Sequence, residues 1–468
     1  MMKKVAFRRV IAALLLAVML VQPVFAAEPD QDVAVAQGCH SADAQMNVLG
    51  SDRLISNCKA AMLYELNSDT MMYAYEADRS MYPASLVKIM TALIAVEQGD
   101  LSDAVTVRQE VLDTVDATAV SVDLQADEVL TLEDLLYCMM VYSANDAAAV
   151  IADHICGDQD AFVEKMNAYA EELGCTGTNY VNVHGLHNSD QITTARDVVK
   201  ILAHASKNES FNRFFNATEY TVPATNKSDE RFLVTGNYLM STAEVRIYYD
   251  DRVVGSRTGA TALGDRCVAS IAQENGMKLL CLIMGAESEY NEDGNKVKSF
   301  GGFPETTALL DLGFADGYRP VQLMYQGQTL EQCKVEGGTN DVVLGISTDI
   351  STVLRGDQGL NDIRFTFSEG YNQLKAPIEE GQVVGTVSLW NGSVCIGTAD
   401  IYAMSDVETE SPKLSYLPRK TLTAGKIVLI ICIVLVAAFG GILCVRWIKT
   451  IRVVKQKRRR RHSRRRSR

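Results

Sequence analysis

A serine followed three residues later by a lysine, in the run Ser85-Leu86-Val87-Lys88, is the first pattern that could do covalent chemistry. A serine hydroxyl becomes an effective nucleophile when a neighbouring base takes its proton. Residues three apart share a face of a helix, so a helical segment would bring the Lys88 amine to Ser85. The start of a helix also presents free N–H groups and a positive dipole end, which suit a developing oxyanion. The pattern predicts an activated serine.

A second pattern, Ser143-Ala144-Asn145, falls at a break between two predicted helices. A hydroxyl there can relay a proton to a leaving amine, and an amide can hold a substrate peptide. Serine and asparagine at the start of a helix also serve simply as caps. Taken alone, this pattern favours the cap.

A third pattern, Arg257-Thr258-Gly259, precedes a strong hairpin signal. A strand that carries a cation and a hydroxyl, with a glycine that allows close backbone approach, would hold a substrate carboxylate. The alternative is an ordinary turn that enters a strand. Two look-alikes, Ser56 to Lys59 and Ser206 to Asn208, match the first two patterns by chance.

The elements that must position these residues are helices mixed with antiparallel strands, which predicts an α+β fold. Ser85 to Val96 is apolar nearly all round and predicts a buried helix. Thr131 to Asp134 reads as a capping box that opens a second helix, and a third follows Asn145. The remaining expectations are a hairpin over 59–76, helices over 159–173 and 194–206, a hairpin over 266–284 and a helix over 306–312.

After Tyr318 the pattern changes to short β-like runs separated by glycine-rich turns, which predicts a small all-β sandwich or barrel. The sequence therefore predicts a catalytic domain over residues 51–318 and a β domain over residues 319–406. An acidic linker over 27–50 precedes them, and a stalk over 407–426 follows.

The order and spacing of the three patterns turn separate weak signals into one specific signal. Ser143 lies 58 residues after Ser85, and Arg257 lies 114 residues after Ser143. The sequence here resembles the low-molecular-mass penicillin-binding proteins, the serine D-alanyl-D-alanine carboxypeptidases of the penicillin-recognising fold. The likeness covers about residues 52–406 and extends to the segments 79–91, 133–148, 182–186 and 376–385.

The resemblance implies a β-lactamase-like catalytic domain, with an antiparallel sheet flanked by helices, and an acyl-enzyme route. Ser85 would attack the carbonyl between two D-alanines of a peptidoglycan stem peptide, with Lys88 as general base. Ser143 would relay the proton, and Asn145 would bind the peptide amide. The carboxylate would be held by Arg257 and Thr258, beside Gly259, and the N–H groups of Ser85 and Ala260 would form the oxyanion hole. β-Lactams would acylate the same serine, and no metal or cofactor is implied.

The sequence departs from the family pattern in two places. The third motif usually begins with lysine, whereas here it begins with Arg257, which keeps the charge but is bulkier and does not release its proton. Some relatives also supply an arginine just before the last helix of the catalytic domain, where this chain has Phe300 to Pro304 without a basic residue. The hypothesis is that Arg257 serves both roles.

Three other interpretations are weaker. A β-lactamase needs a second base, and the nearest string, Glu171 to Gly174, lacks the asparagine of that motif. A zinc peptidase would need ligands, and His184 and His187 have no carboxylate at ligand spacing, so a loop role is favoured. A wall-binding protein with a degenerate peptidase fold is supported only by Arg257.

The two ends of the chain predict its location. Residues 1–26 have the basic, apolar and small-residue order of a secretory signal. Ile427 to Val445 is 19 residues without a charge, enough to span a bilayer as helix. Residues 446–468 carry 13 Lys or Arg and no acid, which favours a cytoplasmic tail that rests on anionic lipid. The catalytic domain would then face the outside of a cell membrane.

The charge of the segment between the signal and the span argues against nucleic acid as a partner. Of the 45 basic residues, 4 lie in the signal and 13 in the tail, which leaves 28 against all 58 acidic residues and a formal charge of −30. Such a surface repels polyanions.

Nine cysteines lie outside the span, at irregular spacings that predict no disulfide framework. Cys267 and Cys281 flank the Asn275-Gly276 turn. Counting outward from the turn places Cys267 opposite about Met284 and Cys281 opposite about Ser270, so a bridge between the two cysteines is not expected.

Overall fold

The structure is a computed structural model that describes residues 48–49, 53–241, 246–260, 265–291, 297–315, 317–392, 394–410 and 424–463. The predicted signal peptide, nearly all of the acidic linker and residues 411–423 of the stalk lie outside the described residues. The chain divides into two compact units, Met1–Thr409 and Glu410–Arg468, which are described separately.

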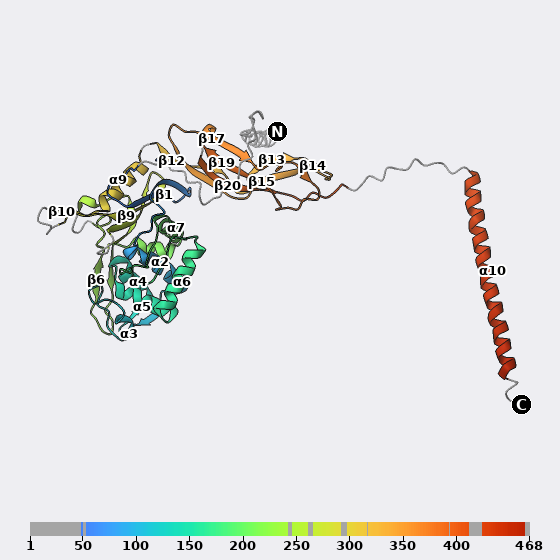
Figure 1. Ribbon diagram of the computed structural model, residues 1–468, viewed down its shortest axis with the longest axis horizontal. Coiled ribbons are helices and arrows are strands. Elements are labelled where there is room, and N and C mark those ends of the chain that lie inside the picture. Colours follow the sequence, from blue (N-terminus) through green and yellow to red (C-terminus); the bar gives the residue numbers. More distant parts are fainter. Residues whose placement is uncertain are drawn as a thin grey trace, which may run out of the picture. The chain divides into compact units, whose positions relative to one another are not determined.

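A five-stranded antiparallel sheet organises the catalytic region (Figure 1). The first strands of the chain pair with strands that come about 200 residues later, so the sheet joins both ends of this region. The strand β7, which carries the third motif, lies at one edge. In spatial order the strands are β2 (Thr70–Tyr75), β1 (Ala60–Glu65), β9 (Met277–Ala286), β8 (Arg266–Glu274) and β7 (Val253–Gly259).

Both faces of this sheet are buried, and successive residues of its central strands alternate between two apolar clusters. On β9, Leu280 and Leu282 face the larger cluster, whereas Leu279 and Cys281 face the smaller one. The larger cluster is covered by a group of helices: α2 (Val87–Gln98), α4 (Leu132–Val141), α5 (Asn145–Cys156), α6 (Gln159–Glu172), α7 (Ala195–Ala205) and α8 (Glu209–Phe215). The smaller cluster is covered by α9 (Phe303–Gly313).

The predicted hairpins and long helices are present, and the differences are local. The helix expected from Ser85 begins as a 3-10 turn, η1 (Ala84–Leu86), before α2 continues it. The capping box is present, since Thr131 Oγ1 accepts from Asp134 N at 3.0 Å and Asp134 Oδ2 accepts from Thr131 N at 3.1 Å. Shorter elements were not predicted: α3 (Gln109–Leu112), α8, and the pairs β3 (Ala104–Thr106) with β4 (Val129–Thr131) and β5 (Glu219–Val222) with β6 (Arg231–Val234).

The sequence after Tyr318 forms β structure around a third apolar cluster, as predicted. Its main sheet has five strands, in the order β13 (Thr329–Cys333), β15 (Val342–Ile346), β20 (Val394–Ala403), β19 (Val383–Asn391) and β17 (Ile363–Phe367). A separate antiparallel pair is formed by β12 (Tyr318–Met324) and β16 (Ile350–Arg355), and β14 (Val335–Glu336) pairs with β18 (Leu374–Lys375).

The second unit contains one helix, α10 (Ala424–Ser463), within its described residues. Val428–Thr450 within it is apolar and long enough to cross a membrane. The described helix continues past the predicted span, 427–445, into the basic tail.

The register of the β8–β9 hairpin keeps Cys267 and Cys281 apart, as expected. Cys281 is opposite Ser270, and both cysteines are free and buried. Cys395 is disulfide-bonded, so an isolated bridge exists without a framework.

Candidate active site

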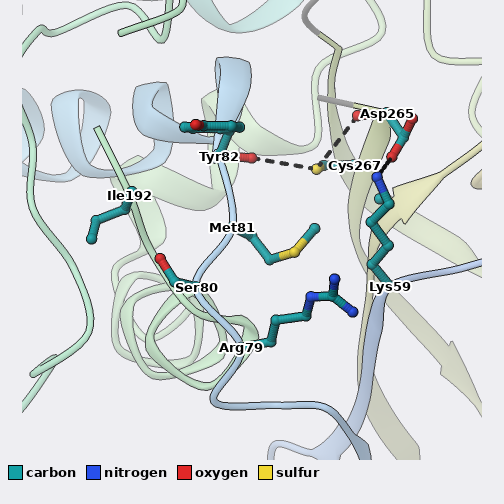
Figure 2. A pocket seen from close by; sticks show the side chains of 9 residues that line it. Lys59, Arg79, Ser80, Met81, Tyr82, Ile192, Asp265 and Cys267 are labelled. Atoms are coloured by element: carbon teal, nitrogen blue, oxygen red, sulfur yellow. Dashed lines mark hydrogen bonds and ion pairs between the residues drawn. The ribbon is translucent and has the colours of Figure 1, made fainter. Parts of the chain in front are cut away.

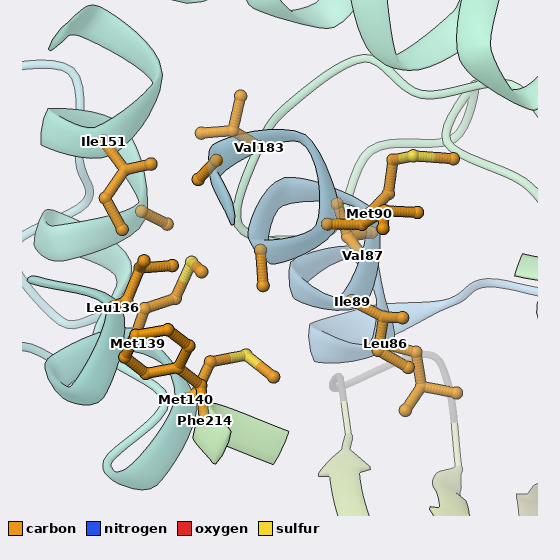
Figure 3. Packing of buried hydrophobic residues seen from close by; sticks show 14 of the residues in the cluster. Leu86, Val87, Ile89, Met90, Leu136, Met139, Met140, Ile151, Val183 and Phe214 are labelled. Carbon is orange, nitrogen blue, oxygen red and sulfur yellow. The ribbon is translucent and has the colours of Figure 1, made fainter. Parts of the chain in front are cut away.

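The helix α2 is a rigid support for Ser85 and Lys88 because it is packed on nearly every side. Nine of its twelve residues are buried, including Lys88. Figure 3 shows Leu136, Met139 and Met140 of α4 and Ile151 of α5 on one side of this helix, and Val87, Ile89 and Met90 on the other. The apolar sequence predicted a buried helix, and α2 lies inside the domain. Ser85 is half-buried in the 3-10 turn that precedes it.

The amine of Lys88 touches three oxygen atoms that come from three different segments. Lys88 Nζ lies 3.2 Å from Ser85 Oγ, 2.9 Å from Asn145 Oδ1 and 2.6 Å from the carbonyl oxygen of His184. The side chain of Asn145 is held in this orientation because its Nδ2 donates to Val120 O at 2.8 Å. The first two motifs of the sequence thus meet at one nitrogen.

Charge and burial act together on Lys88. Burial holds the pKa of Lys88 well below its ordinary value of 10.5, and the Arg257 charge lowers it further. The buried carboxylate of Asp146 opposes this change. Burial also lowers the pKa of Arg257, to about 10. The electrostatics favour a neutral amine beside the hydroxyl, the condition that a general base requires.

The second motif lies between α4 and α5, as predicted, but Asn145 is not a cap. Ala144 is the N-cap residue and makes no side-chain cap bond, whereas Asn145 reaches Lys88. Ser143 has a left-handed backbone with φ +64° and is half-buried. Such a backbone in a non-glycine residue is strained and is often found at functional sites. By contrast, Asn208 of the look-alike pattern does cap a helix, accepting from Phe211 N at 3.1 Å.

The third motif occupies the end of the edge strand β7 beside the nucleophile. A Cβ atom added to Gly259 would lie 2.6 Å from the backbone nitrogen of Ser85, so only glycine permits this approach. Thr258 is half-buried and Ala260 is exposed. Arg257 is 5% exposed and donates from Nη2 to Met139 O at 2.9 Å, while its Nε has no hydrogen-bond partner among the described residues.

Sequence reasoning assigned a loop role to His184, and the structure adds a function for its carbonyl, which accepts from Lys88. The following residue, Gly185, has φ +89°, and a Cβ there would lie 2.0 Å from Ala84 O. The segment 182–186 therefore packs directly against the turn that carries Ser85. In the sequence, residues 182–186 could be singled out only by their likeness to the family. That likeness did not indicate that they contact Lys88 and Ala84.

Residues 300–304 contain no basic residue, but a cation from another part of the chain lies beside them. The Arg266 guanidinium of β8 lies over the rings of Phe300 and Phe303, at 5.3 and 5.5 Å from their centroids. Sequence reasoning missed this residue because it comes from a strand remote from the segment along the chain.

A cavity of about 240 Å³ lies along Arg79 to Tyr82, the strand-like segment that leads to Ser85 (Figure 2). Its lining includes Cys267 and an ion pair between Lys59 and Asp265. Lys59 of the first look-alike pattern is thus paired with an acid, and neither Ser85 nor Lys88 lines this cavity.

An antiparallel sheet covered by helices, with a serine and a buried lysine on one helix and a cation on the edge strand, defines the class of penicillin-recognising serine peptidases. Comparison with known proteins gives the family. Residues 50–288 match the family model described as D-alanyl-D-alanine carboxypeptidase, peptidase family S11. Residues 318–409 match the C-terminal domain of penicillin-binding protein 5. The chain belongs to the D-alanyl-D-alanine carboxypeptidase family of serine peptidases.

Individual relatives agree with the family model. The chain is 30% identical to the D-alanyl-D-alanine carboxypeptidase DacA of Haemophilus influenzae, over 74% of this chain and 84% of that protein. It is 26% identical to DacF of Bacillus subtilis, over 79% of this chain and 90% of that protein. The crystal structure of penicillin-binding protein 5 from Haemophilus influenzae superposes with a TM-score of 0.64 at 26% identity, covering 77% of this chain and 99% of that one.

Proposed function

We propose that this enzyme removes the terminal D-alanine from peptidoglycan stem peptides through an acyl-enzyme on Ser85. The substrate class follows from the names of the relatives, and the chemistry follows from the site. Attack of Ser85 Oγ on the carbonyl forms an ester and breaks the bond to the departing D-alanine nitrogen. Lys88 takes the Oγ proton, and Ser143 relays a proton to the departing amine. Water then cleaves the ester and restores the serine.

One observation carries the proposal: the three neighbours of the Lys88 amine. A neutral amine has two N–H bonds and one lone pair. Asn145 Oδ1 and the His184 carbonyl can only accept hydrogen bonds, so they take the two N–H groups. The lone pair is then left for the hydroxyl of Ser85, at 3.2 Å. Since the pKa of Lys88 is lowered by burial and by Arg257, the neutral form is available to act as base.

The remaining roles are proposed from position. Asn145 Nδ2 and the edge of β7 would hold the peptide, and Arg257 with Thr258 would hold its terminal carboxylate. The backbone N–H groups of Ser85 and Ala260 would stabilise the oxyanion, since Gly259 brings the two segments into contact. β-Lactams present a carbonyl and a carboxylate to the same groups, and would be trapped as esters.

The test uses the full chain in detergent, with a labelled penicillin followed by a D-Ala-D-Ala peptide and Ser85→Ala as the control. The expected result is an adduct on Ser85, found by mass spectrometry, together with free D-alanine. An adduct without D-alanine would favour the wall-binding protein, and rapid release of hydrolysed penicillin would favour the β-lactamase. Absence of any adduct would overturn the proposal.

We also propose that Val428–Thr450 anchors the enzyme in the cell membrane, with the catalytic region outside and the tail in the cytoplasm. The apolar helix and the 13 basic residues after Val445 support this orientation. Protease added to intact protoplasts should remove the catalytic region and spare a tag fused to Arg468. Cleavage of that tag in intact protoplasts would contradict the orientation.

A further inference from the structure

We propose that Gln191 is a positioning residue for the catalytic lysine, acting through the backbone of the loop 181–191. The inference rests on the proposed function of Lys88 as base. Gln191 is 2% exposed, lies 103 positions from Lys88 in the sequence, and belongs to none of the three motifs.

The side chain of Gln191 closes the loop on itself. Its Oε1 accepts from Val181 N at 3.0 Å and from Asn182 N at 2.9 Å, and its Nε2 donates to Asn182 Oδ1 at 3.0 Å. All three of these bonds go to the start of the loop. The residue therefore ties the two ends of the loop together, nine and ten residues apart.

Asn182, which Gln191 holds in place, in turn fixes the residues on either side of the Lys88 contact. Its Oδ1 also accepts from Gly185 N at 2.7 Å, and its Nδ2 donates to Leu186 O at 2.9 Å. The carbonyl of His184 lies inside this closed turn and accepts from Lys88 at 2.6 Å. Removing Gln191 from the network would loosen the turn that holds one of the three partners of the Lys88 amine.

A second contact fixes the same turn from the helix. Thr91, one turn after Lys88 on α2, donates from Oγ1 to Val183 O at 2.6 Å. Val183 and His184 are adjacent, so α2 holds two consecutive carbonyls of the loop through Thr91 and Lys88. The loop and the helix thus form one assembly, in which Gln191 closes the loop and Thr91 fastens it.

The chain just after Gln191 also contacts the segment that leads to Ser85. Thr193, two residues after Gln191, exchanges backbone hydrogen bonds with Met81 at 2.8 and 2.9 Å, and Gly185 packs under Ala84. The loop therefore supports both the base and the turn that carries Ser85. Displacement of the His184 carbonyl would remove one partner of the Lys88 amine, and its lone pair would then have no fixed direction.

The test compares Gln191→Met with Asn167→Leu in the full chain. Asn167 is a matched control, because its side-chain amide also makes two backbone hydrogen bonds: its Nδ2 donates to Tyr180 O and its Oδ1 accepts from Tyr180 N, both at 2.8 Å. These bonds lie outside the network that Gln191 closes. Both changes replace an amide by an apolar side chain of similar size. The measured quantities are the rate of penicillin acylation as a function of pH and the melting temperature.

Gln191→Met should lower the acylation rate on the order of 100-fold, the loss expected when a catalytic group is misplaced by about 1 Å. In the plot of acylation rate against pH, the midpoint of the rise on the acid side (the acid limb) should also move to higher pH, toward the ordinary pKa of lysine. The reason is that a loosened loop admits water to the Lys88 amine, whose pKa is lowered mainly by burial. The charged and titratable groups around that amine, Arg257, Asp146 and His184, are unchanged in this variant. Asn167→Leu should lower only the melting temperature.

Thr91→Val gives a second approach, since it removes the hydroxyl at nearly constant volume. It should slow acylation and shift the limb in the same direction, and Thr91→Ser should restore both. Wild-type rate and midpoint in Gln191→Met and in Thr91→Val would overturn this inference, as would equal changes in the Asn167 control. Failure of the proposed function is distinguishable, because the wild type itself would then form no ester on Ser85.

Discussion

The Nη2 atom of Arg257 donates to the carbonyl oxygen of Met139 at 2.9 Å and ties the edge strand β7 to the last turn of α4. That carbonyl is one of the groups that a helix leaves unpaired at its C-terminus, where a cation is favoured by the helix dipole. The fork of the guanidinium leaves other N–H groups for a second partner. Arg257 can therefore make a structural hydrogen bond with one N–H group and offer its other N–H groups to a second partner.

Arg257→Lys should therefore weaken carboxylate recognition although the charge is kept. One ammonium cannot serve both the Met139 carbonyl and a substrate carboxylate with the geometry of a planar fork. We expect kcat/KM for a D-Ala-D-Ala peptide to fall about 10- to 100-fold, equivalent to the roughly 1.5–3 kcal/mol of a hydrogen bond to a charged group. The loss should be smaller for the same peptide with its carboxylate amidated.

Arg213→Lys is the control for the arginine-to-lysine change, because Arg213 forms a half-exposed ion pair with Glu133 on the outer side of α4. Its kcat/KM should match that of the wild type. Unchanged kcat/KM in Arg257→Lys would mean that the carboxylate is held by another group.

The acid limb of the acylation rate should respond in opposite directions to two charge removals. Arg257 lowers the pKa of Lys88, so Arg257→Gln should move the limb to higher pH. Asp146 raises the pKa of Lys88, so Asp146→Asn should move the limb to lower pH. The measurement is the second-order rate of penicillin acylation across the acid and alkaline range. Shifts in the same direction would contradict the assignment of this limb to Lys88.

His184 should make the folded state sensitive to acid. Burial lowers its pKa from 6.5 to about 4, and the Lys88 charge adds to the effect. Between these two values the unfolded chain binds the proton more readily, so stability falls as the pH falls through this window. Across this window the free energy of unfolding should decrease by about 3 kcal/mol in total, because lowering a pKa by one corresponds to about 1.4 kcal/mol.

Urea unfolding monitored at neutral pH and near the lower of these two pKa values would measure this dependence. His184→Gln should flatten it, whereas His187→Gln should not, because the His187 side chain is more exposed. An equal slope in the wild type and His184→Gln would refute the prediction.

Gly185→Ala should abolish acylation, because the added methyl group would overlap the Ala84 carbonyl directly below Ser85. The matched control is Gly276→Ala, at the tip of the β8–β9 hairpin. Both glycines have a positive φ, +89° and +80°, but a Cβ at Gly276 meets nothing within 4 Å. Both variants should lose the roughly 1 kcal/mol of a strained backbone. Only Gly185→Ala should also lose reaction with penicillin, scored by gel fluorescence with a labelled analogue.

Residues close in sequence could be predicted, because helix and strand periodicity determine which of them share a face. This is why Ser85 with Lys88, the capping box at Thr131 and the register of Cys281 were predicted correctly. The family resemblance gave Asn145 a role in the site, but its contact with Lys88 could not be predicted from the residues, since a cap and a ligand require the same residue type. Only the packing of α5 against α2 decides between them.

Contacts made by the backbone were the least accessible to sequence reasoning. The carbonyls of Met139 and His184 are chemically the same as any other carbonyl in the chain, so nothing in the sequence marks them as partners of Arg257 and Lys88. The cation at Phe300 was missed for a related reason. Arg266 reaches that segment from a neighbouring strand, and distance along the chain hides the relationship.

The burial of α2 has a consequence for how the rate responds to temperature. Because packing holds Ser85 and Lys88 in contact before any ligand arrives, the conformational entropy of bringing them together is lost during folding and not during the reaction. The ordering of these two groups therefore adds no entropic cost to the barrier to acylation. Cooling the enzyme should slow bond making and breaking without disordering the groups that perform it.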